Sequence, residues 1–275
     1  MPKTVDDVKK FWDSNPLWSG ESQHEAGTKE FFEEHRRVKI DDVFAGELDE
    51  RLFPKCSPSG RLLDLGCGPG FWLVEAASRD HKNIAAADLT ENGLLLARRR
   101  CDLYGVKAFF SQQNAEELGF RDSTFSHVNC DGVIHHTPDT DACIREMARV
   151  LEDEGTAVIS VYYRNIVLRA WPVLGWAGRL LSKMGAKLSG RGREKIFEVK
   201  DAEEMVRLYD GKDNPIGKCY TQKDFVKMLS PYFHVEETFL HYFPARSLPF
   251  GIPKALHKLL DRYLGFMIYA VMRKR

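Results

Sequence analysis

The stretch LLDLGCGPGFW at residues 62–72 places three glycines in five positions between two apolar runs. Glycine loses more backbone freedom on folding than any other residue, so this cluster would be costly inside a helix or strand. We interpret LLDL as a strand and GCGPG as the turn into a helix, which Pro69 can start. Gly66 and Gly68 would then let the backbone approach a ligand, and Gly70 would let the helix pack on the strand. N–H groups at the start of the helix would face that ligand.

From residue 61 onward, short apolar runs alternate with helical patterns. We predict strands at 61–65, 83–89, 107–112, 126–132 and 155–163, and helices at 71–79, 91–105 and 139–151. Such alternation is typical of an α/β fold, a parallel sheet with helices on both faces. Two closing strands are predicted at 234–243 and 265–275. The second could instead continue the helix at 253–264, but β-branched and aromatic residues and the preceding Gly265 favour a strand.

The pattern divides the chain into four segments. Residues 1–55 form a helical N-terminal cover that ends at the Pro-, Ser- and Gly-rich stretch 54–60. Residues 56–163 form the ligand-binding core. Residues 164–220 are helical and irregular, and we interpret them as an insertion or lid. Residues 221–275 supply the closing helices and strands.

Composition limits the function classes. Lys and Arg number 40, Asp and Glu number 40, and this zero net charge gives no support for a nucleic-acid partner. Six cysteines without a CxxC pair indicate reduced thiols, and the charged N-terminus lacks a signal peptide, so we expect a cytoplasmic protein. Arg169 and Arg179 interrupt the apolar run at 166–181, which excludes stable membrane insertion. We expect no metal, since no His/Asp cluster has ligand spacing.

Acidic and amide residues near the strand ends indicate the kind of ligand. Asp64 lies two positions before Gly66, where a carboxylate disfavours a pyrophosphate and suits a cationic amino group. Asp88 ends the second strand, 22 positions after Gly66 (88 − 66 = 22), at a distance suited to binding ribose hydroxyls. Asn114 follows the third strand and is placed to bond an adenine edge, beside the backbone of Ala115. This pattern predicts a nucleoside carrying an amino acid. Dinucleotide binding, the rival, fits the G-x-G-x-G spacing less well.

Four motifs in order, LLDLGCGPG, AADLT, NAEELGFRDSTFSHV and DGVIHHTPD, resemble those of the class I S-adenosylmethionine-dependent methyltransferases. The resemblance covers residues 60–163, and the closing strands more loosely. It is closest to the small-molecule branch, methyltransferase type 11, which includes the ubiquinone/menaquinone methyltransferases. It implies a Rossmann-like, seven-stranded, mostly parallel sheet with an antiparallel last strand. It also implies S-adenosyl-L-methionine as cofactor and S-adenosyl-L-homocysteine as product.

The resemblance also implies cofactor-binding residues. The residues of the first turn would surround the methionyl part of the cofactor. The residues at the end of the second strand would hold the ribose and adenine, and the residues after the third strand would contact the base. The full set is Asp64, Gly66, Cys67, Gly68, Asp88, Leu89, Asn114, Ala115, Asp131 and Trp18. Many relatives have Asp at the position of Asn114 and Asn at that of Asp131. Trp12 or Trp18 would shield the sulfonium through cation–π attraction, with simple helix packing as the alternative.

His135 and His136 are the candidate catalytic residues, because an imidazole titrates near neutral pH. We favour His135, since the first residue of this pair points to the methyl site in related enzymes. The alternative is that the histidines only hold the loop, because many relatives act by proximity alone. Candidate substrate-binding residues are Tyr163, Arg164, Tyr209 and Tyr220. For Arg164 the alternative is a solvated charge, and for the two later tyrosines it is a loop packed on the core.

These observations predict a methyltransferase of biosynthesis that transfers the methyl group by in-line displacement to a small, partly apolar metabolite. One alternative is a tRNA or protein methyltransferase of the same fold, which would need a basic face. The other is a non-catalytic cofactor-binding assembly protein. The apolar and basic stretches 169–185 and 248–260 suggest a lid, with a peripheral membrane contact or a homodimer as alternatives. The basic stretch 187–195 is interpreted as a solvated loop in preference to an RNA or phosphate clamp.

Overall fold

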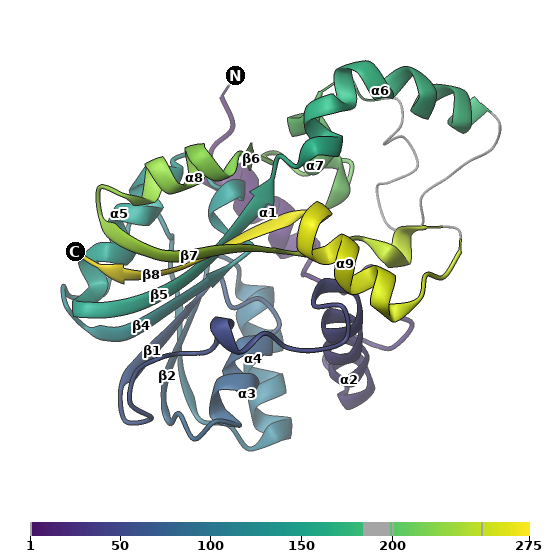
Figure 1. Ribbon diagram of the computed structural model, residues 1–275. Helices are drawn as coiled ribbons and strands as arrows, with labels where there is room; N and C mark the ends of the chain where they lie inside the picture. The colour runs from purple at the N-terminus through teal and green to yellow at the C-terminus, as the bar shows by residue number, and fades with distance from the viewer. Residues whose placement is uncertain (1, 184–198, 200, 249) are drawn as a thin grey trace.

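A twisted β-sheet forms the centre of the protein in the computed structural model, which describes residues 2–183, 199, 201–248 and 250–275 (Figure 1). The strand order is β3-β2-β1-β4-β5-β8-β7, and β6 pairs with β5 beside this path. The strands are β1 (Arg61–Leu65), β2 (Asn83–Asp88), β3 (Ala108–Gln112), β4 (Phe125–Asp131), β5 (Leu151–Tyr163), β6 (Cys219–Tyr220), β7 (Phe233–His241) and β8 (Met267–Lys274).

The pairing directions confirm the predicted fold class. Strands β1 to β5 pair in parallel, while β8 runs antiparallel to both β5 and β7. The mostly parallel sheet with an antiparallel last strand is therefore present, and the alternative of a continued helix after Gly265 is wrong. The two-residue strand β6 was not predicted, because it is too short to show an alternating pattern.

Helices cover both faces of the sheet, because alternate strand residues point to opposite sides. On one face Leu63 and Val128 pack with α5 (Thr140–Val150) and α8 (Gln222–Leu229). On the other face Leu62 and Ile84 pack with α3 (Phe71–Ala77) and α4 (Glu91–Tyr104). Asp139 caps α5 by accepting the backbone N–H of Ala142.

The N-terminal segment lies against α4. It contains α1 (Val5–Ser14), α2 (Lys29–Val38), a π-helical turn (Lys39–Val43) and a short 3₁₀ turn (Glu50–Leu52). Both α1 and α2 contact α4. The fully buried Phe31 and Phe32 anchor α2.

Three further helices lie on one side of the molecule, at the right of Figure 1. They are α6 (Ile166–Lys183), α7 (Ala202–Tyr209) and α9 (Lys254–Leu264), which connects β7 to β8. None of the helices in the described part of the chain is both long and apolar enough to cross a membrane. The basic stretch 187–195 lies outside the described residues. The division into four segments stays a prediction.

Candidate functional site

The glycine turn after β1 lies at the carboxyl edge of the sheet. The backbone N–H groups of Gly66 and Cys67 donate to the carbonyl of Ala87, 2.7 and 3.1 Å away, which fixes the turn to the end of β2. Gly66 and Gly68 have φ of +72° and +46°, a region that side chains rarely adopt. A Cβ on Gly66 would collide with Val133, whereas a Cβ on Gly68 would meet nothing within 4 Å. Gly68 therefore borders open space that a ligand can fill.

That open space is a cavity of about 150 Å³, which we name the cofactor cavity. Its walls come mainly from the ends of β1, β2 and β4, the segment after β3, and α1. The lining includes Val8, Trp12, Gly66, Gly68, Asp88, Leu89, Thr90, Asn114, Ala115, Asp131, Gly132, Val133 and His136. The structure thus brings together seven of the ten predicted cofactor residues: Gly66, Gly68, Asp88, Leu89, Asn114, Ala115 and Asp131.

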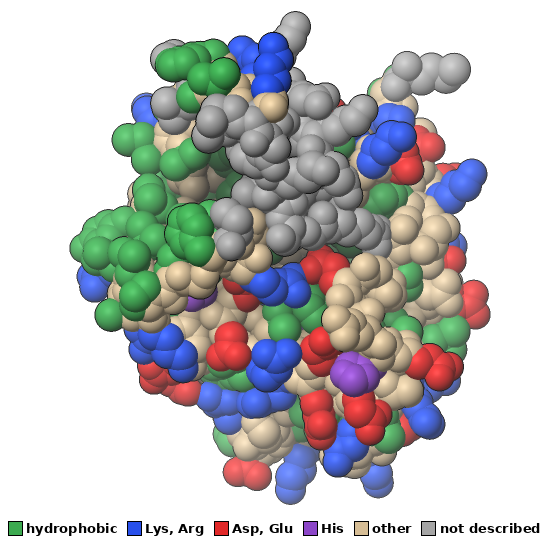
Figure 2. All heavy atoms as spheres, turned by 90° about the vertical axis from the view of Figure 1, so that its right-hand side faces the viewer, with side chains coloured by type: hydrophobic (Ala, Val, Ile, Leu, Met, Phe, Trp, Pro, Cys, Tyr) green, Lys and Arg blue, Asp and Glu red, His purple; other side chains and the backbone are tan. Residues whose placement is uncertain are grey.

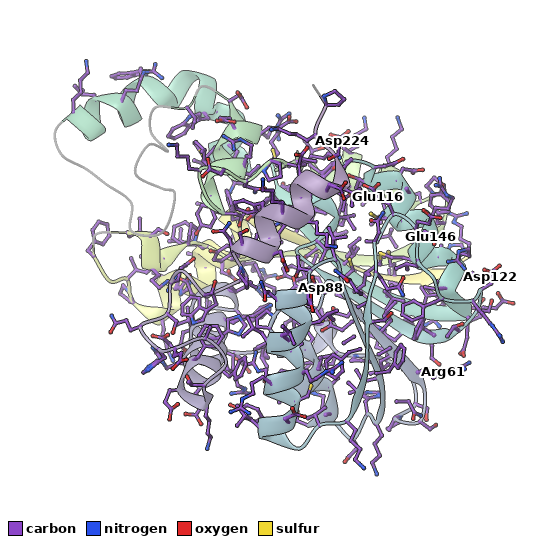
Figure 3. The ribbon with its side chains drawn as sticks, turned by 180° about the vertical axis from the view of Figure 1, so that it is seen from behind. Arg61, Asp88, Glu116, Asp122, Glu146 and Asp224 are labelled. Atoms are coloured by element: carbon purple, nitrogen blue, oxygen red, sulfur yellow. The ribbon has the colours of Figure 1, made fainter. Side chains whose placement is uncertain are left out.

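Asp88 is held rigidly at this cavity (Figure 3). Its Oδ2 accepts the N–H of Gly68 at 2.9 Å, and its Oδ1 accepts the N–H and hydroxyl of Thr90 at 2.9 and 2.7 Å. Burial raises the pKa of this carboxyl above its ordinary value, against the lowering effect of these hydrogen bonds. The carboxylate that would bind a ribose is therefore oriented by the glycine turn itself.

Asp64 and Cys67 do not line the cofactor cavity. Asp64 is buried behind the turn, beside Trp72, where its Oδ1 accepts the amide of Asn129 at 2.7 Å. Its Oδ2 has no hydrogen-bond partner among the described residues, and burial raises its pKa to about 7. Burial also raises the pKa of the Cys67 thiol well above its usual value. The position of Asp64 follows from strand alternation, which turns it to the same face of β1 as Leu62, toward Trp72. Their cofactor role stays a prediction.

Asp131 stands at the end of β4 and accepts three hydrogen bonds. Lys39 Nζ is 2.8 Å away, Trp72 Nε1 2.9 Å and Ser160 Oγ 2.6 Å. Burial would raise the pKa of Asp131, but the charge and hydrogen bond of Lys39 and the bonds from Ser160 and Trp72 lower it below its usual value. The sequence analysis missed Lys39, because it carries no motif and lies 92 positions away.

Beyond Asp131 lies a second cavity of about 210 Å³, the acceptor cavity. Aromatic rings and polar groups from distant segments line it, including Trp12, Trp18, Lys39, Asp42, His135, His136, Tyr162, Tyr209, Asp210, Tyr242, Arg246 and Tyr269. The two cavities share Trp12, Pro16, Leu17, Asp131, Gly132 and His136. Ligands in the two cavities would therefore meet at the end of β4.

Trp12 lines both cavities, whereas Trp18 lines only the acceptor cavity. The ring of Trp12 lies 5.1 Å from that of His136. Trp18 instead packs near His35, with the guanidinium of Arg246 over its ring at 4.9 Å. Of the two tryptophans considered from sequence, the geometry favours Trp12 as the one beside a bound cofactor. The reason is that α1 carries Trp12 directly over the junction, while the chain turns away before Trp18.

The two histidines differ in their surroundings. His135 is buried and lines only the acceptor cavity, and burial, then the charges of His136 and Lys218, hold its pKa well below the usual value. His136 lines both cavities. Its Nδ1 lies 2.7 Å from the carbonyl of Ile216, which requires a proton on that nitrogen.

The other ring nitrogen of His136, Nε2, lies 3.5 Å from Asp210 Oδ2. Asp210 Oδ1 accepts the hydroxyl of Tyr162 at 2.7 Å. A carboxylate at this place would stabilise an imidazolium. His136 thus borders both cavities, whereas His135, which the sequence analysis favoured, borders one, and a catalytic role for either histidine stays a prediction.

Of the predicted substrate residues, the structure brings only Tyr209 to the acceptor cavity, where its hydroxyl lies 2.7 Å from that of Tyr242. Tyr163 packs against the main core, and Tyr220 bonds the hydroxyl of Thr140 at 3.1 Å. Arg164 lies 3.9 Å from Glu203 in an exposed ion pair. Within the described residues, no group of three or more His, Cys, Asp or Glu is placed to hold a metal ion.

Comparisons with known proteins agree with this geometry. Residues 62–155 match the family described as a methyltransferase domain. A ubiquinone biosynthesis O-methyltransferase of Xanthomonas campestris pv. campestris (strain B100) is 33% identical over 129 residues. That match covers 46% of this chain and 54% of the relative, so the chain spans about half the length of such curated relatives.

Solved structures share the fold at low identity. A SAM-dependent methyltransferase from Methanosarcina mazei aligns with a TM-score of 0.53 and 19% identity, over 80% of this chain and 94% of that one. The [4+2]-cyclase SpnF aligns with a TM-score of 0.55 and 16% identity, over 100% and 97% of the two chains. S-adenosylmethionine fits the cofactor cavity, because Gly68 leaves open space beside the turn and the carboxylate of Asp88 lines the same cavity. Residues 62–155 therefore form a methyltransferase domain, and the sheet order and this cavity support a class I S-adenosylmethionine-dependent methyltransferase.

Proposed function

We propose that this protein transfers a methyl group from S-adenosylmethionine to a small, partly apolar acceptor. The observation that carries the proposal is the shared wall of the two cavities at Asp131, Gly132 and His136. In-line displacement requires the acceptor atom, the methyl carbon and the sulfur to lie on one line. Two cavities that meet at a single strand end can hold the two reactants in this way.

The residues of the chain divide the work. Asp88 binds the ribose, and Asn114 and Ala115 contact the adenine. The cofactor supplies the methyl group on its sulfonium. His136 Nε2 takes a proton from the acceptor, while the Ile216 carbonyl fixes the ring and Asp210 stabilises the charge that forms. Trp12 excludes water from the junction.

The acceptor is expected to be aromatic or partly apolar, because Trp12, Trp18, Tyr162, Tyr209, Tyr242 and Tyr269 line its cavity. The six cysteines are all unpaired thiols, which supports a place in cytoplasmic biosynthesis. The fold alone does not establish the reaction, since the cyclase SpnF shares it. A tRNA or protein methyltransferase and a non-catalytic cofactor-binding protein remain the alternatives to test.

The test begins with calorimetry of S-adenosylhomocysteine and of NAD. We expect heat only from the former; tight NAD binding with no heat from S-adenosylhomocysteine would end the proposal. Turnover is then measured with methyl-labelled S-adenosylmethionine on phenols, aromatic amines and total tRNA. Labelling of tRNA that collapses with salt would favour the tRNA alternative. Binding without transfer to any acceptor would favour the non-catalytic one.

Asp210→Asn separates binding from chemistry. Asp210 lines only the acceptor cavity, so the affinity for S-adenosylhomocysteine should stay the same. The kcat for an acceptor that loses a proton should fall about 100-fold, the usual contribution of general base catalysis. Asp213→Asn, an exposed neighbour, is the matched control. An unchanged kcat in Asp210→Asn would show that Asp210 does not assist His136.

A further inference from the structure

Helix α9 (Lys254–Leu264) buries its polar side and exposes its apolar side. His257 and Asp261, one turn apart, are buried. Leu256, Leu259 and Tyr263 lie on the outer side and are 41%, 55% and 62% exposed. An amphipathic helix normally turns its apolar stripe toward the core. We call the three outer residues the apolar face of α9.

Polar contacts from the end of β7 hold α9 in this orientation. Asp261 Oδ2 lies 2.6 Å from His241 Nδ1, and its Oδ1 accepts the N–H of Phe243 at 3.0 Å. His257 Nε2 lies 3.1 Å from the carbonyl of Phe243. These buried groups would lose their partners if the helix rotated, and an unpaired buried polar group is costly. The outward orientation of the apolar face is therefore built into the packing.

The exposed charged residues of α9 itself are all positive. The exposed ionic residues of α9 are Lys254, Lys258 and Arg262. Lys258 lies 3.1 Å from Glu47, while no carboxylate of the described residues pairs with Lys254 or Arg262. This excess is local, because the whole chain has a net charge of zero.

A second helix on the same side of the molecule repeats the composition. Helix α6 exposes Trp176 and Leu180 together with Arg179 and Lys183, and its sequence contains no acidic residue. Figures 1 and 3 both show α6 and α9 projecting from this side of the sheet. Figure 2 shows hydrophobic side chains gathered along the left of that side, with Lys and Arg side chains close by.

We propose that the apolar face of α9 binds the surface of an anionic lipid bilayer, with α6 as a second contact. Apolar side chains would enter the interface between headgroups and acyl chains, and the flanking cations would face anionic headgroups. Tyr263 and Trp176 are aromatic residues of the kind that favours this interface. A second copy of the chain fits less well, because a two-fold contact would bring Lys254 and Arg262 of both copies together.

The test is sedimentation of the full chain with phosphatidylcholine vesicles, with and without phosphatidylglycerol. We expect binding only to the anionic vesicles, and weaker binding at high salt. Leu259→Glu should weaken partitioning about tenfold or more. Lys254→Ala and Arg262→Ala should each weaken it about fivefold. Phe109→Glu, at a residue equally exposed on β3, is the matched control and should bind normally.

Two outcomes would overturn the proposal. One is equal binding to both kinds of vesicle, or binding that Leu259→Glu leaves unchanged. The other is a chain that ignores vesicles but forms a dimer weakened by Leu259→Glu in analytical ultracentrifugation, which would assign the face to a second copy. Calorimetry with S-adenosylhomocysteine on the same variant checks its fold and separates this result from the proposed function. Its affinity should stay that of the unaltered chain.

Discussion

The cofactor cavity and the acceptor cavity are assembled in different ways. Most residues that line the cofactor cavity lie at or just after the carboxyl ends of β1, β2, β3 and β4, so the edge of the sheet determines their positions. The acceptor cavity takes its walls from segments that range from Trp12 in α1 to Tyr269 in β8. The first depends on backbone geometry and the second on the packing of distant segments. The acceptor side can therefore change its chemistry while the cofactor side stays the same.

The largest effect is expected from Arg100→Met. The buried side chain of Arg100 contacts His35, which lines the acceptor cavity, and Pro69, which lines the cofactor cavity. Its guanidinium donates to the carbonyls of Pro69 and Phe32 at 3.2 and 3.0 Å and lies 3.1 Å from His35 Nδ1. Losing it leaves two buried carbonyl acceptors unpaired, so the free energy of unfolding should fall by about 3 kcal/mol in urea denaturation.

Arg99→Met is the control for that variant, since Arg99 is exposed on the same helix. It should change the free energy of unfolding by less than about 0.5 kcal/mol. Equal effects from the two substitutions would show that Arg100 does not link the N-terminal cover to the glycine turn.

Asp88→Ala tests whether the cofactor cavity depends on one oriented carboxylate. The substitution removes the hydrogen bond that Asp88 accepts from Gly68 N–H and the proposed hydrogen bonds to the ribose. Charged hydrogen bonds contribute about 1.5–3 kcal/mol each, so the Kd for S-adenosylhomocysteine should rise about 100-fold by calorimetry. Asp102→Ala, at an exposed position of α4, should leave the Kd unchanged. A Kd that stays the same in Asp88→Ala would remove the ribose assignment.

A comparison of Gly68→Ala with Gly105→Ala separates the effect of backbone strain on stability from the loss of space for the ligand. Both glycines have positive φ, and neither would place a Cβ within 4 Å of another group. Both should therefore cost a similar amount of stability, about 1 kcal/mol. Only Gly68→Ala should also raise the Kd for S-adenosylhomocysteine, by about tenfold, since Gly68 borders the cofactor cavity. This assignment of the open space would be contradicted if the two variants lost different amounts of stability, or if both bound S-adenosylhomocysteine with the same Kd.

On the acceptor side, the smallest expected effect comes from His241, which lies between Asp261 and Asp49 at 2.6 and 3.0 Å. Burial lowers its pKa, but the hydrogen bonds that the imidazole donates to these two carboxylates outweigh burial and raise the pKa above 6.5. A raised pKa adds stability that is fully present below pH 6.5 and lost as pH rises through the folded-state pKa.

The free energy of unfolding should therefore decrease as pH rises above 6.5, in thermal melts across pH. His241→Gln should flatten this dependence. His234→Gln, at an exposed position of the same strand, should keep it. If both variants keep the slope, the cluster does not control the attachment of α9.

The sequence determined the strands, the glycine turn and the residues that directly follow strands. Gly66, Gly68, Asp88 and Asn114 were found in this way, because a parallel sheet gathers its carboxyl ends at one edge. Strand alternation placed Asp64 behind the turn, and this could have been read from β1 itself.

Only the tertiary structure decided the acceptor cavity and the orientation of α9. Lys39, Asp210 and Arg246 carry no local motif, and distant packing alone brings them to one space. The apolar stripe of α9 suggests an inward face, yet His241 and Phe243 hold its polar side inside. Local patterns report which residues share a face, whereas buried polar partners from elsewhere in the chain decide which way that face turns.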